Sequence, residues 1–340
     1  MADHTTAWER FEDWIKKVIE LRGTDLHLVP GYKPMARVDG KLQQVDDLLL
    51  TREQTHWVGV CLFGNQVLYE MGYPAYMHQS RTYGDTIADI SLATAGGGKT
   101  VAVRLHGGKI PSIEDVNLPE RVTELLNAPN GIVLVAGPHG SGKTTTLYAL
   151  VDWINRNRAL HICTVEKPRH YMFKPLQAVV SQREVGLDGA NHAAVLQAAM
   201  QQDPDVIMIG EIEDFETLAG ALHAAETGHL VIVQVHAGDA REAVERIVSA
   251  APEGMQAKVQ KQLAETLRGI TVQRLARHND GRVRTAIYDV IGEGARKFAQ
   301  GGTPDAGFYI CRAQDGIKQL EDDGKIDKEE AERLRREVGA

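Results

Sequence analysis

The sequence predicts an α/β protein of two domains, the larger of which holds a mostly parallel sheet. Three observations support this prediction. The chain has 340 residues, a length that favours about two domains. After residue 118, apolar runs typical of buried strands alternate with helical patterns, as in a parallel α/β sheet. Before that point, shorter stretches alternate polar and apolar residues, with turn residues between them.

Residues 1–108 are predicted to form a small α/β domain that begins with a helix. Residues 6–22 carry Trp and other apolar side chains at helical spacing, with acidic residues among them. The acidic residues favour an amphipathic helix packed on its own domain over a helix lying on a membrane surface. The other elements predicted here are strands at 24–30 and 34–42, the second turning at Asp39-Gly40, helices within 52–72 and a hairpin spanning 90–105 with glycines at 96–98.

The remaining chain is predicted to contain a linker, the larger domain and a terminal segment. Residues 109–118 lack clear periodicity and are typical of an inter-domain linker. The larger domain covers 119–301, and the charged segment 302–340 is expected to form two short helices with Gly324 between them. Within the larger domain, strands are predicted at 131–136, 161–165, 206–210 and 230–235, and helices at 144–157, 191–202, 214–226 and 240–250.

The stretch Gly137–Thr144 fits the pattern G-x-x-x-x-G-K-[ST] of a phosphate-binding loop. It lies between an apolar strand and an apolar helix, which argues against a Gly-rich turn that fits by chance. Its backbone N–H groups and the helix N-terminus would hold phosphate oxygens, Lys143 would reach the β- and γ-phosphates, and the Thr144 hydroxyl would bind Mg²⁺. The residues predicted to bind a nucleoside triphosphate are Gly137, Gly140, Ser141, Gly142, Lys143, Thr144 and Thr145.

Two predicted strands end in carboxylates that could take part in phosphate chemistry. Glu211 and Glu166 follow strands whose carboxyl ends would form the ligand-binding edge of a parallel sheet. Glu211 could orient or deprotonate an attacking water, and Glu166 could hold a magnesium-bound water. The alternative for each is an exposed carboxylate without function. His229 begins the next strand and could contact the γ-phosphate, while a purely structural histidine fits the pattern equally well.

The composition is that of a soluble globular protein, with 43% hydrophobic and 25% charged residues. The net charge of −8 gives no global attraction to nucleic acid or to an anionic membrane. Cys61, Cys163 and Cys311 are scattered, which indicates neither a disulfide framework nor a zinc module and favours the reducing cytosol. We expect no signal peptide and no membrane span, so membrane contact would occur only through a partner.

Together these stretches resemble the hexameric secretion ATPases, and within them the pilus retraction (twitching motility) branch. The resemblance implies a RecA-like P-loop ATPase domain with a smaller α/β (PAS-like) N-terminal domain. The matching stretches are Gly137–Thr144 (Walker A), Glu166 and Pro168 (Asp box), Asp203–Glu211 (Walker B) and Ala224–His229 with His236 (His box).

Several positions depart from the family pattern and bear on hydrolysis. Lys167 stands at the Asp of Glu-Asp-Pro, Gln201 replaces an Arg, and Glu213 replaces the Arg of Gly-Glu-Met-Arg-Asp. The Thr-Leu-His-Thr stretch is Gln-Val-His-Ala at 234–237, and the retraction signature Ala-Ile-Arg-x-Leu is missing. An N-terminal strand of the family supplies arginines to a neighbour's site, and here no arginine lies between Arg81 and Arg104. Arg104 is the candidate for that contact with the phosphates across a subunit boundary.

The resemblance implies a cytoplasmic ATPase, peripheral to the inner membrane, that forms a ring of six subunits and drives pilus retraction. The implied cofactors are ATP and Mg²⁺, with Glu211, Glu166, His229 and Arg104 as catalytic residues and Thr144 and Glu166 at the metal. The implied partners are further copies of the chain, an inner-membrane platform protein and a paralogous motor ATPase, without nucleic acid. Two alternatives stay open: an auxiliary or regulatory ring subunit that hydrolyses ATP poorly, and a nucleic-acid translocase.

Overall fold

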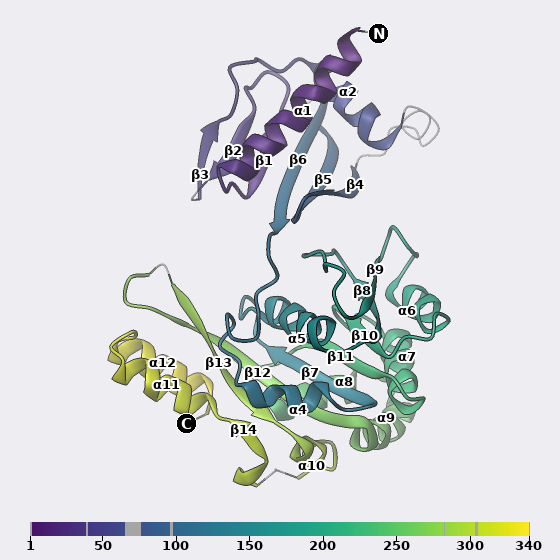
Figure 1. Ribbon diagram of the computed structural model, residues 1–340, viewed down its shortest axis with the longest axis vertical. Coiled ribbons are helices and arrows are strands. Elements are labelled where there is room, and N and C mark those ends of the chain that lie inside the picture. Colours follow the sequence, from purple (N-terminus) through teal and green to yellow (C-terminus); the bar gives the residue numbers. More distant parts are fainter. Residues whose placement is uncertain are drawn as a thin grey trace. The chain divides into compact units, whose positions relative to one another are not determined.

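The chain divides into two compact units, each with its own apolar core (Figure 1). The computed structural model describes residues 2–38, 40–64, 76–95, 98–281, 283–302 and 305–339. Unit 1 comprises Met1–Lys109 together with His170–Met172, and unit 2 comprises Ile110–Arg169 and Phe173–Ala340.

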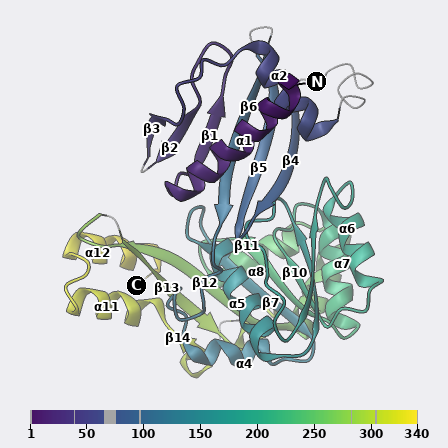
Figure 2. The same ribbon diagram turned by 45° about the horizontal axis from the view of Figure 1, so that its top comes forward.

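Unit 1 is a six-stranded antiparallel sheet in the order β3-β2-β1-β6-β5-β4, with helix α1 lying along one face (Figure 2). Phe11, Trp14, Ile15 and Val18 of α1 are buried in its core. This burial confirms the packed amphipathic helix, because each such side chain contributes about 1.5–3 kcal/mol when removed from water. The elements are α1 (Ala2–Glu20), β1 (Asp25–Leu28), β2 (Met35–Val38), β3 (Lys41–Gln44), α2 (Arg52–Phe63), β4 (Tyr76–Tyr83), β5 (Thr86–Ala95) and β6 (Gly98–Gly107).

Most elements predicted for unit 1 are found among the described residues. Helix α2 confirms the helical prediction as far as Phe63 and is followed by Gly64 with a left-handed φ of 80°, while the rest of the predicted stretch to 72 lies outside the described residues. The prediction also misses β4, an edge strand whose mostly polar sequence hides the alternation expected of a half-buried strand. Asp39, residues 65–75 and the glycines at 96 and 97 lie outside the described residues.

Unit 2 confirms the predicted parallel α/β sheet. Eight strands follow the order β14-β13-β12-β7-β11-β10-β8-β9, and the six from β12 to β9 run parallel. Strand β7 is buried along its whole length, as its continuous apolar sequence requires. The elements are η1 (Glu120–Val122), α4 (Thr123–Leu126), β7 (Gly131–Gly137), α5 (Lys143–Asn157), β8 (His161–Glu166), β9 (Val179–Glu184), α6 (His192–Met200), β10 (Val206–Ile209), α7 (Phe215–Glu226), β11 (Leu230–His236), α8 (Ala240–Ser249), α9 (Glu253–Thr266), β12 (Leu267–Arg277), β13 (Arg284–Ile291), η2 (Glu293–Ala295), α10 (Arg296–Ala299), η3 (Ala306–Phe308), β14 (Tyr309–Cys311), α11 (Ala313–Asp322) and α12 (Lys328–Glu337).

Strands β9, β12, β13 and β14 complete the sheet but are missed by the sequence prediction. β12 carries Gln273 and Arg274, both nearly fully buried, so it does not read as a continuous apolar run. The Arg274 guanidinium donates to the carbonyl oxygens of Gly238 and Glu337, which offsets the cost of burying its charge. The two helices predicted after residue 302 are α11 and α12, with Gly324 between them at a left-handed φ of 67°.

The finer boundaries at 108, 118 and 301 stay predictions. Within the predicted linker, the Val116 carbonyl oxygen accepts a hydrogen bond of 2.7 Å from the Tyr288 hydroxyl. The Asn117 side-chain amide donates to the Ala286 carbonyl oxygen at 3.0 Å. These bonds fix the end of that segment to β13, so this part of it belongs structurally to unit 2.

Candidate nucleotide-binding site

The predicted phosphate loop connects the buried carboxyl end of β7 to the N-terminus of α5. Gly140 and Gly142 adopt left-handed φ angles of 72° and 88°, which only glycine reaches without strain. A Cβ atom at Gly137 would lie 2.5 Å from Ser141 Oγ, so the loop is also too tight there for a side chain. This backbone path and the N-terminus of the 15-residue helix α5 make an anion-binding cradle.

Lys143, Thr144 and Thr145 form the first turn of α5 below this cradle. The Lys143 ammonium group donates a hydrogen bond of 2.8 Å to the Pro138 carbonyl oxygen, which keeps it folded over the loop. Burial lowers the pKa of Lys143 from its usual value, and the nearby Glu211 carboxylate opposes that shift. The Thr144 hydroxyl donates to Gln234 Oε1 on β11 at 3.0 Å, and its oxygen lone pairs fit the role of a metal ligand. Thr145 is half-buried.

Ser141 provides a test of whether the cradle fits a phosphate. Its Oγ atom is buried and has no hydrogen-bond partner among the described residues. The backbone carbonyl of Ser141 accepts from Gln273 Nε2 at 2.5 Å, which ties the loop to β12. A buried hydroxyl without a partner costs free energy, and a phosphate oxygen would supply the missing acceptor. The loop therefore fits a nucleotide phosphate.

Glu211 lies at the same edge of the sheet as the phosphate loop. It follows β10 at its carboxyl end, and only β11 separates β10 from β7. Its side chain is exposed, and its charge opposes the lowering of the pKa values of both Lys143 and His236. The structure thus brings together the lysine and the carboxylate that the sequence predicts for this site.

Glu166, predicted at the end of the neighbouring strand, is buried rather than exposed. Its carboxylate oxygens accept hydrogen bonds from the hydroxyls of Tyr148 and Thr164 and from Gln182 Nε2, the last at 3.1 Å. Burial raises the pKa of Glu166 to about 8, against the opposing effects of Gln182 and Arg169. The alternative of an exposed carboxylate is wrong for Glu166, and its contact with a magnesium-bound water stays a prediction.

His229 lies far from the phosphate loop of its own chain. Strand β11 runs parallel to β7, with Leu230 paired to Gly131 and His236 paired to Gly137. His229 therefore precedes β11 at the amino edge of the sheet, about 20 Å of strand away from the loop at about 3.3 Å per residue. The predicted contact of His229 with the γ-phosphate held by its own chain is wrong. The His229 ring instead lies 2.9 Å, through Nδ1, from the Ala224 carbonyl oxygen of α7.

His236 is the histidine that β11 delivers to the loop, and reasoning from individual residues missed it. The ring centroids of His236 and His139 lie 4.2 Å apart, and His139 is part of the loop itself. Arg104 belongs to unit 1, on β6, where its side chain is 71% exposed and pairs with Asp25 at 3.3 Å. Its contact with phosphates stays a prediction.

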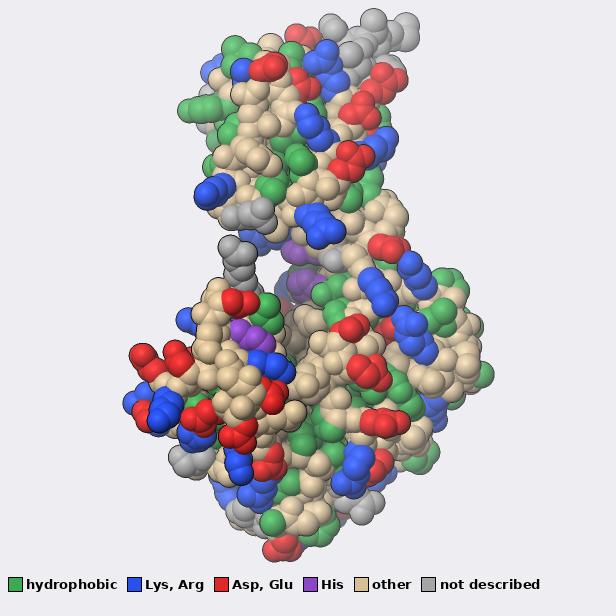
Figure 3. Space-filling model, turned by 60° about the vertical axis from the view of Figure 1, so that its left-hand side comes forward, with side chains coloured by type: hydrophobic (Ala, Val, Ile, Leu, Met, Phe, Trp, Pro, Cys, Tyr) green, Lys and Arg blue, Asp and Glu red, His purple; other side chains and the backbone are tan. Residues whose placement is uncertain are grey.

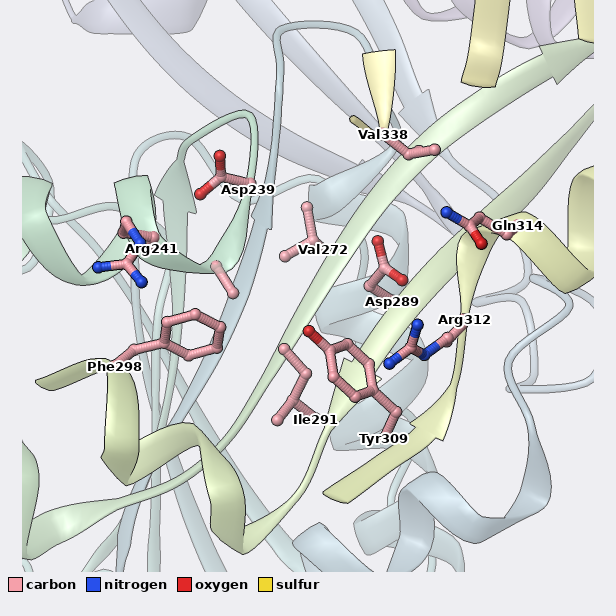
Figure 4. A pocket seen from close by; sticks show the side chains of 11 residues that line it. Asp239, Arg241, Val272, Asp289, Ile291, Phe298, Tyr309, Arg312, Gln314 and Val338 are labelled. Carbon is pink, nitrogen blue, oxygen red and sulfur yellow. The ribbon is translucent and has the colours of Figure 1, made fainter. Parts of the chain in front are cut away.

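Unit 2 also contains a cavity of about 290 Å³ whose lining includes no residue of the loop (Figure 4). Two of its acidic side chains hold helix N-termini: Asp239 accepts from the Glu242 backbone N–H, and Asp289 accepts from that of Ala313. Its arginines lie over aromatic rings, Arg241 over Phe298 and Arg312 over Tyr309. These contacts stabilise helices α8, α10 and α11. Because the charged side chains of the cavity are engaged in them, the phosphate loop is the better candidate for a binding site.

Comparison with known proteins connects this site to a family. A family model described as type II/IV secretion system protein matches residues 99–323. The uncharacterized protein YggR of Escherichia coli (strain K12) is 34% identical over 79% of this chain and 81% of its own length. The type IV pilus retractation ATPase PilT of Pseudomonas aeruginosa is 31% identical over 79% of this chain and 78% of its own.

Solved structures give the same result for the fold. The crystal structure of the pilus retraction motor PilT with bound ADP has a TM-score of 0.82 and 31% identity, over 94% of this chain and 95% of that one. The Legionella pneumophila ATPase DotB has a TM-score of 0.82 at 21% identity, over 96% and 95%. Both support a RecA-like P-loop domain with an N-terminal domain. Across the part of the chain that the structure describes, every helix is too short or too polar to cross a membrane.

Proposed function

Because the chain belongs to the type II/IV secretion system protein family, we propose that it is a motor subunit that converts ATP and water to ADP and phosphate and thereby drives pilus retraction. The observation that carries this proposal is the convergence of three groups at one sheet edge: the phosphate loop with Lys143, the Thr144 hydroxyl and the Glu211 carboxylate. Phosphoryl transfer depends mainly on such positioning and on electrostatic stabilisation.

Each group has a distinct proposed role. Backbone N–H groups from Gly137 to Thr145 would bind the phosphates, and Lys143 would leave the Pro138 carbonyl to reach the β- and γ-phosphates. Mg²⁺, held by Thr144, would neutralise phosphate charge. Glu211 would orient the attacking water or take its proton. Glu166 would hold a magnesium-bound water at the neighbouring strand.

The proposed assembly is a ring of six copies that works in the cytoplasm and reaches the inner membrane through partners. Arg104 would contact phosphates bound by the next subunit, because it is exposed on unit 1 and not enclosed in its core. The expected partners are an inner-membrane platform protein of the pilus machinery and a paralogous motor ATPase. Relatives whose names describe a retraction ATPase and a twitching motility protein support this proposal.

An auxiliary subunit that binds ATP but hydrolyses it slowly is the second candidate. The raised pKa of Glu166, about 8, favours it, because a protonated carboxyl is a poor acceptor for a metal-bound water. A nucleic-acid translocase has less support. The net charge is −8, and acidic and basic side chains are mixed over the face shown in Figure 3.

Phosphate release from ATP and Mg²⁺ by the purified full chain tests the proposal. We expect Lys143→Ala and Glu211→Ala each to reduce release by at least about 10²-fold. Lys318→Ala, at an exposed lysine of α11, is the matched control. If the wild type releases no more phosphate than these two site variants but still binds ATP, the auxiliary role is correct. Salt-dependent binding of DNA would instead support a translocase.

A further inference from the structure

Two histidines face each other at the phosphate loop, and the family resemblance gives no role to the first of them. His139 follows Pro138 within the loop and is exposed. His236 is the last residue of β11 and is paired in register with Gly137, the last residue of β7. Because the two strands are fixed neighbours, the rings are held with their centroids 4.2 Å apart and their planes at 41°.

The surroundings of His236 are mostly positive. The charged groups that act on it are Lys143 from α5, Arg246 from α8, His139 from the loop and Glu211 after β10. Arg246 also donates to the His236 carbonyl oxygen at 2.8 Å and pairs with Glu242 at 3.9 Å. Burial, then the positive neighbours, lower the pKa of His236, which favours its neutral form while the loop is empty. Its Nδ1 atom is buried and has no hydrogen-bond partner among the described residues.

A phosphate anion on the loop would reverse this balance. Negative charge within a few ångströms of an imidazole stabilises its protonated form. Two imidazolium charges at this separation repel each other, so a proton on one ring opposes a proton on the other.

We propose that His139 and His236 act as a pair that takes up one proton from solvent when a nucleotide phosphate binds to the loop. This inference rests on the proposed nucleotide binding and adds a coupling to pH. The bound phosphate then faces one imidazolium, and no covalent bond changes. Because the bound state holds one more proton than the free state, nucleotide affinity decreases as pH rises.

Isothermal titration of the full chain with ADP and Mg²⁺ tests the proposal without relying on catalysis. Repeating each titration in buffers of different ionisation enthalpy counts the protons taken up. We expect the wild type to take up close to one proton more than His139→Gln or His236→Gln at pH 7.5. We also expect the affinity of the wild type for ADP to fall about tenfold more than that of either variant between pH 6.5 and 8.5. Because every protein is titrated with the same nucleotide, protons released or taken up by ADP itself cancel in the comparison.

His223→Gln is the matched control, since His223 is exposed on α7. It should keep the wild-type proton uptake. Equal uptake by the wild type and both site variants would overturn the proposal, and so would loss of uptake in only one of them, because a single histidine would then act alone. Failure of the wild type to bind ADP would instead overturn the proposed function, and this inference with it.

Discussion

The Lys167 ammonium group lies 3.0 Å from Glu213 Oε2, so two positions that depart from the family pattern form one ion pair. The pattern has Asp at the first position and Arg at the second, which is the same pair with its charges exchanged. Glu213 Oε2 is also 3.4 Å from Nδ1 of the buried His192. These two departures reverse the charges of the family pattern at both ends of one contact, which joins the segments after β8 and β10.

Restoring the family's charges tests this exchange. Lys167→Asp would place two carboxylates together, and Glu213→Arg would place two cations together. We expect each single change to lower the free energy of unfolding, and the double change to recover most of the loss. The coupling should be about 0.2–1 kcal/mol, because the two side chains are 52% and 45% exposed. Urea denaturation of the four proteins measures this coupling, and additive single effects would contradict it.

Buried Glu166 makes stability depend on pH in a predictable direction. Its pKa is about 8 in the folded protein and 4.5 in the reference state, so the folded chain holds a proton that the unfolded chain releases. The stabilisation is complete below pH 4.5 and is lost as pH rises towards 8, by up to about 1.4 kcal/mol per pH unit.

Glu166→Gln should remove this pH-dependent contribution to the free energy of unfolding, because a side-chain amide has no carboxyl proton to release. Denaturant unfolding between pH 5 and 9 should therefore show a shallower decrease in stability for the variant than for the wild type. Glu216→Gln, at an exposed glutamate of α7, should follow the wild type. Parallel curves for wild type and Glu166→Gln would show that Glu166 is ionised in the folded protein.

Sequence predicts this site well where the signal is local. The loop from Gly137 to Thr144 is found as expected, because strand, glycines and helix follow one another along the chain. The error at His229 has a different origin. The His box contains one histidine just before β11 and one at its last position, and only the parallel register with β7 shows that His236 is the one at the loop. Likewise, the Lys167–Glu213 pair joins residues 46 positions apart, which no local pattern reveals.

Gly142 is a position of the loop where a side chain should reduce both stability and nucleotide binding. It adopts a left-handed φ of 88° as the N-cap of α5, and an added Cβ would lie 3.1 Å from Gln273 Nε2. Gly142→Ala should cost about 1 kcal/mol of stability from backbone strain and weaken nucleotide binding as well. Gly281→Ala is the matched control, with a φ of 67° and no atom within 4 Å of the added Cβ. Fluorescent ADP titration and thermal unfolding separate the two effects: both variants should lose stability, and only Gly142→Ala should lose affinity.

Arg104 allows a test of whether neighbouring subunits of the proposed ring share an active site. If Arg104 contacts phosphates held by a neighbour, Arg104→Ala should reduce phosphate release by about 10³-fold or more. Lys143→Ala should be equally inactive because its own loop cannot hold the phosphates. In a mixed ring, however, an Arg104→Ala subunit with an intact loop can receive the arginine of an adjacent Lys143→Ala subunit.

Mixing the two inactive proteins should therefore restore part of the phosphate release, up to about a quarter of the wild-type rate for random mixing in equal amounts. Arg37→Ala is the matched control, since Arg37 lies 3.6 Å from the same Asp25 carboxylate on the adjacent side of β1. The Arg37→Ala protein should keep its activity, because Arg37 shares Asp25 with Arg104 but has no proposed contact with the phosphates. Full activity of Arg104→Ala alone, or no recovery on mixing, would show that Arg104 does not act across a subunit boundary.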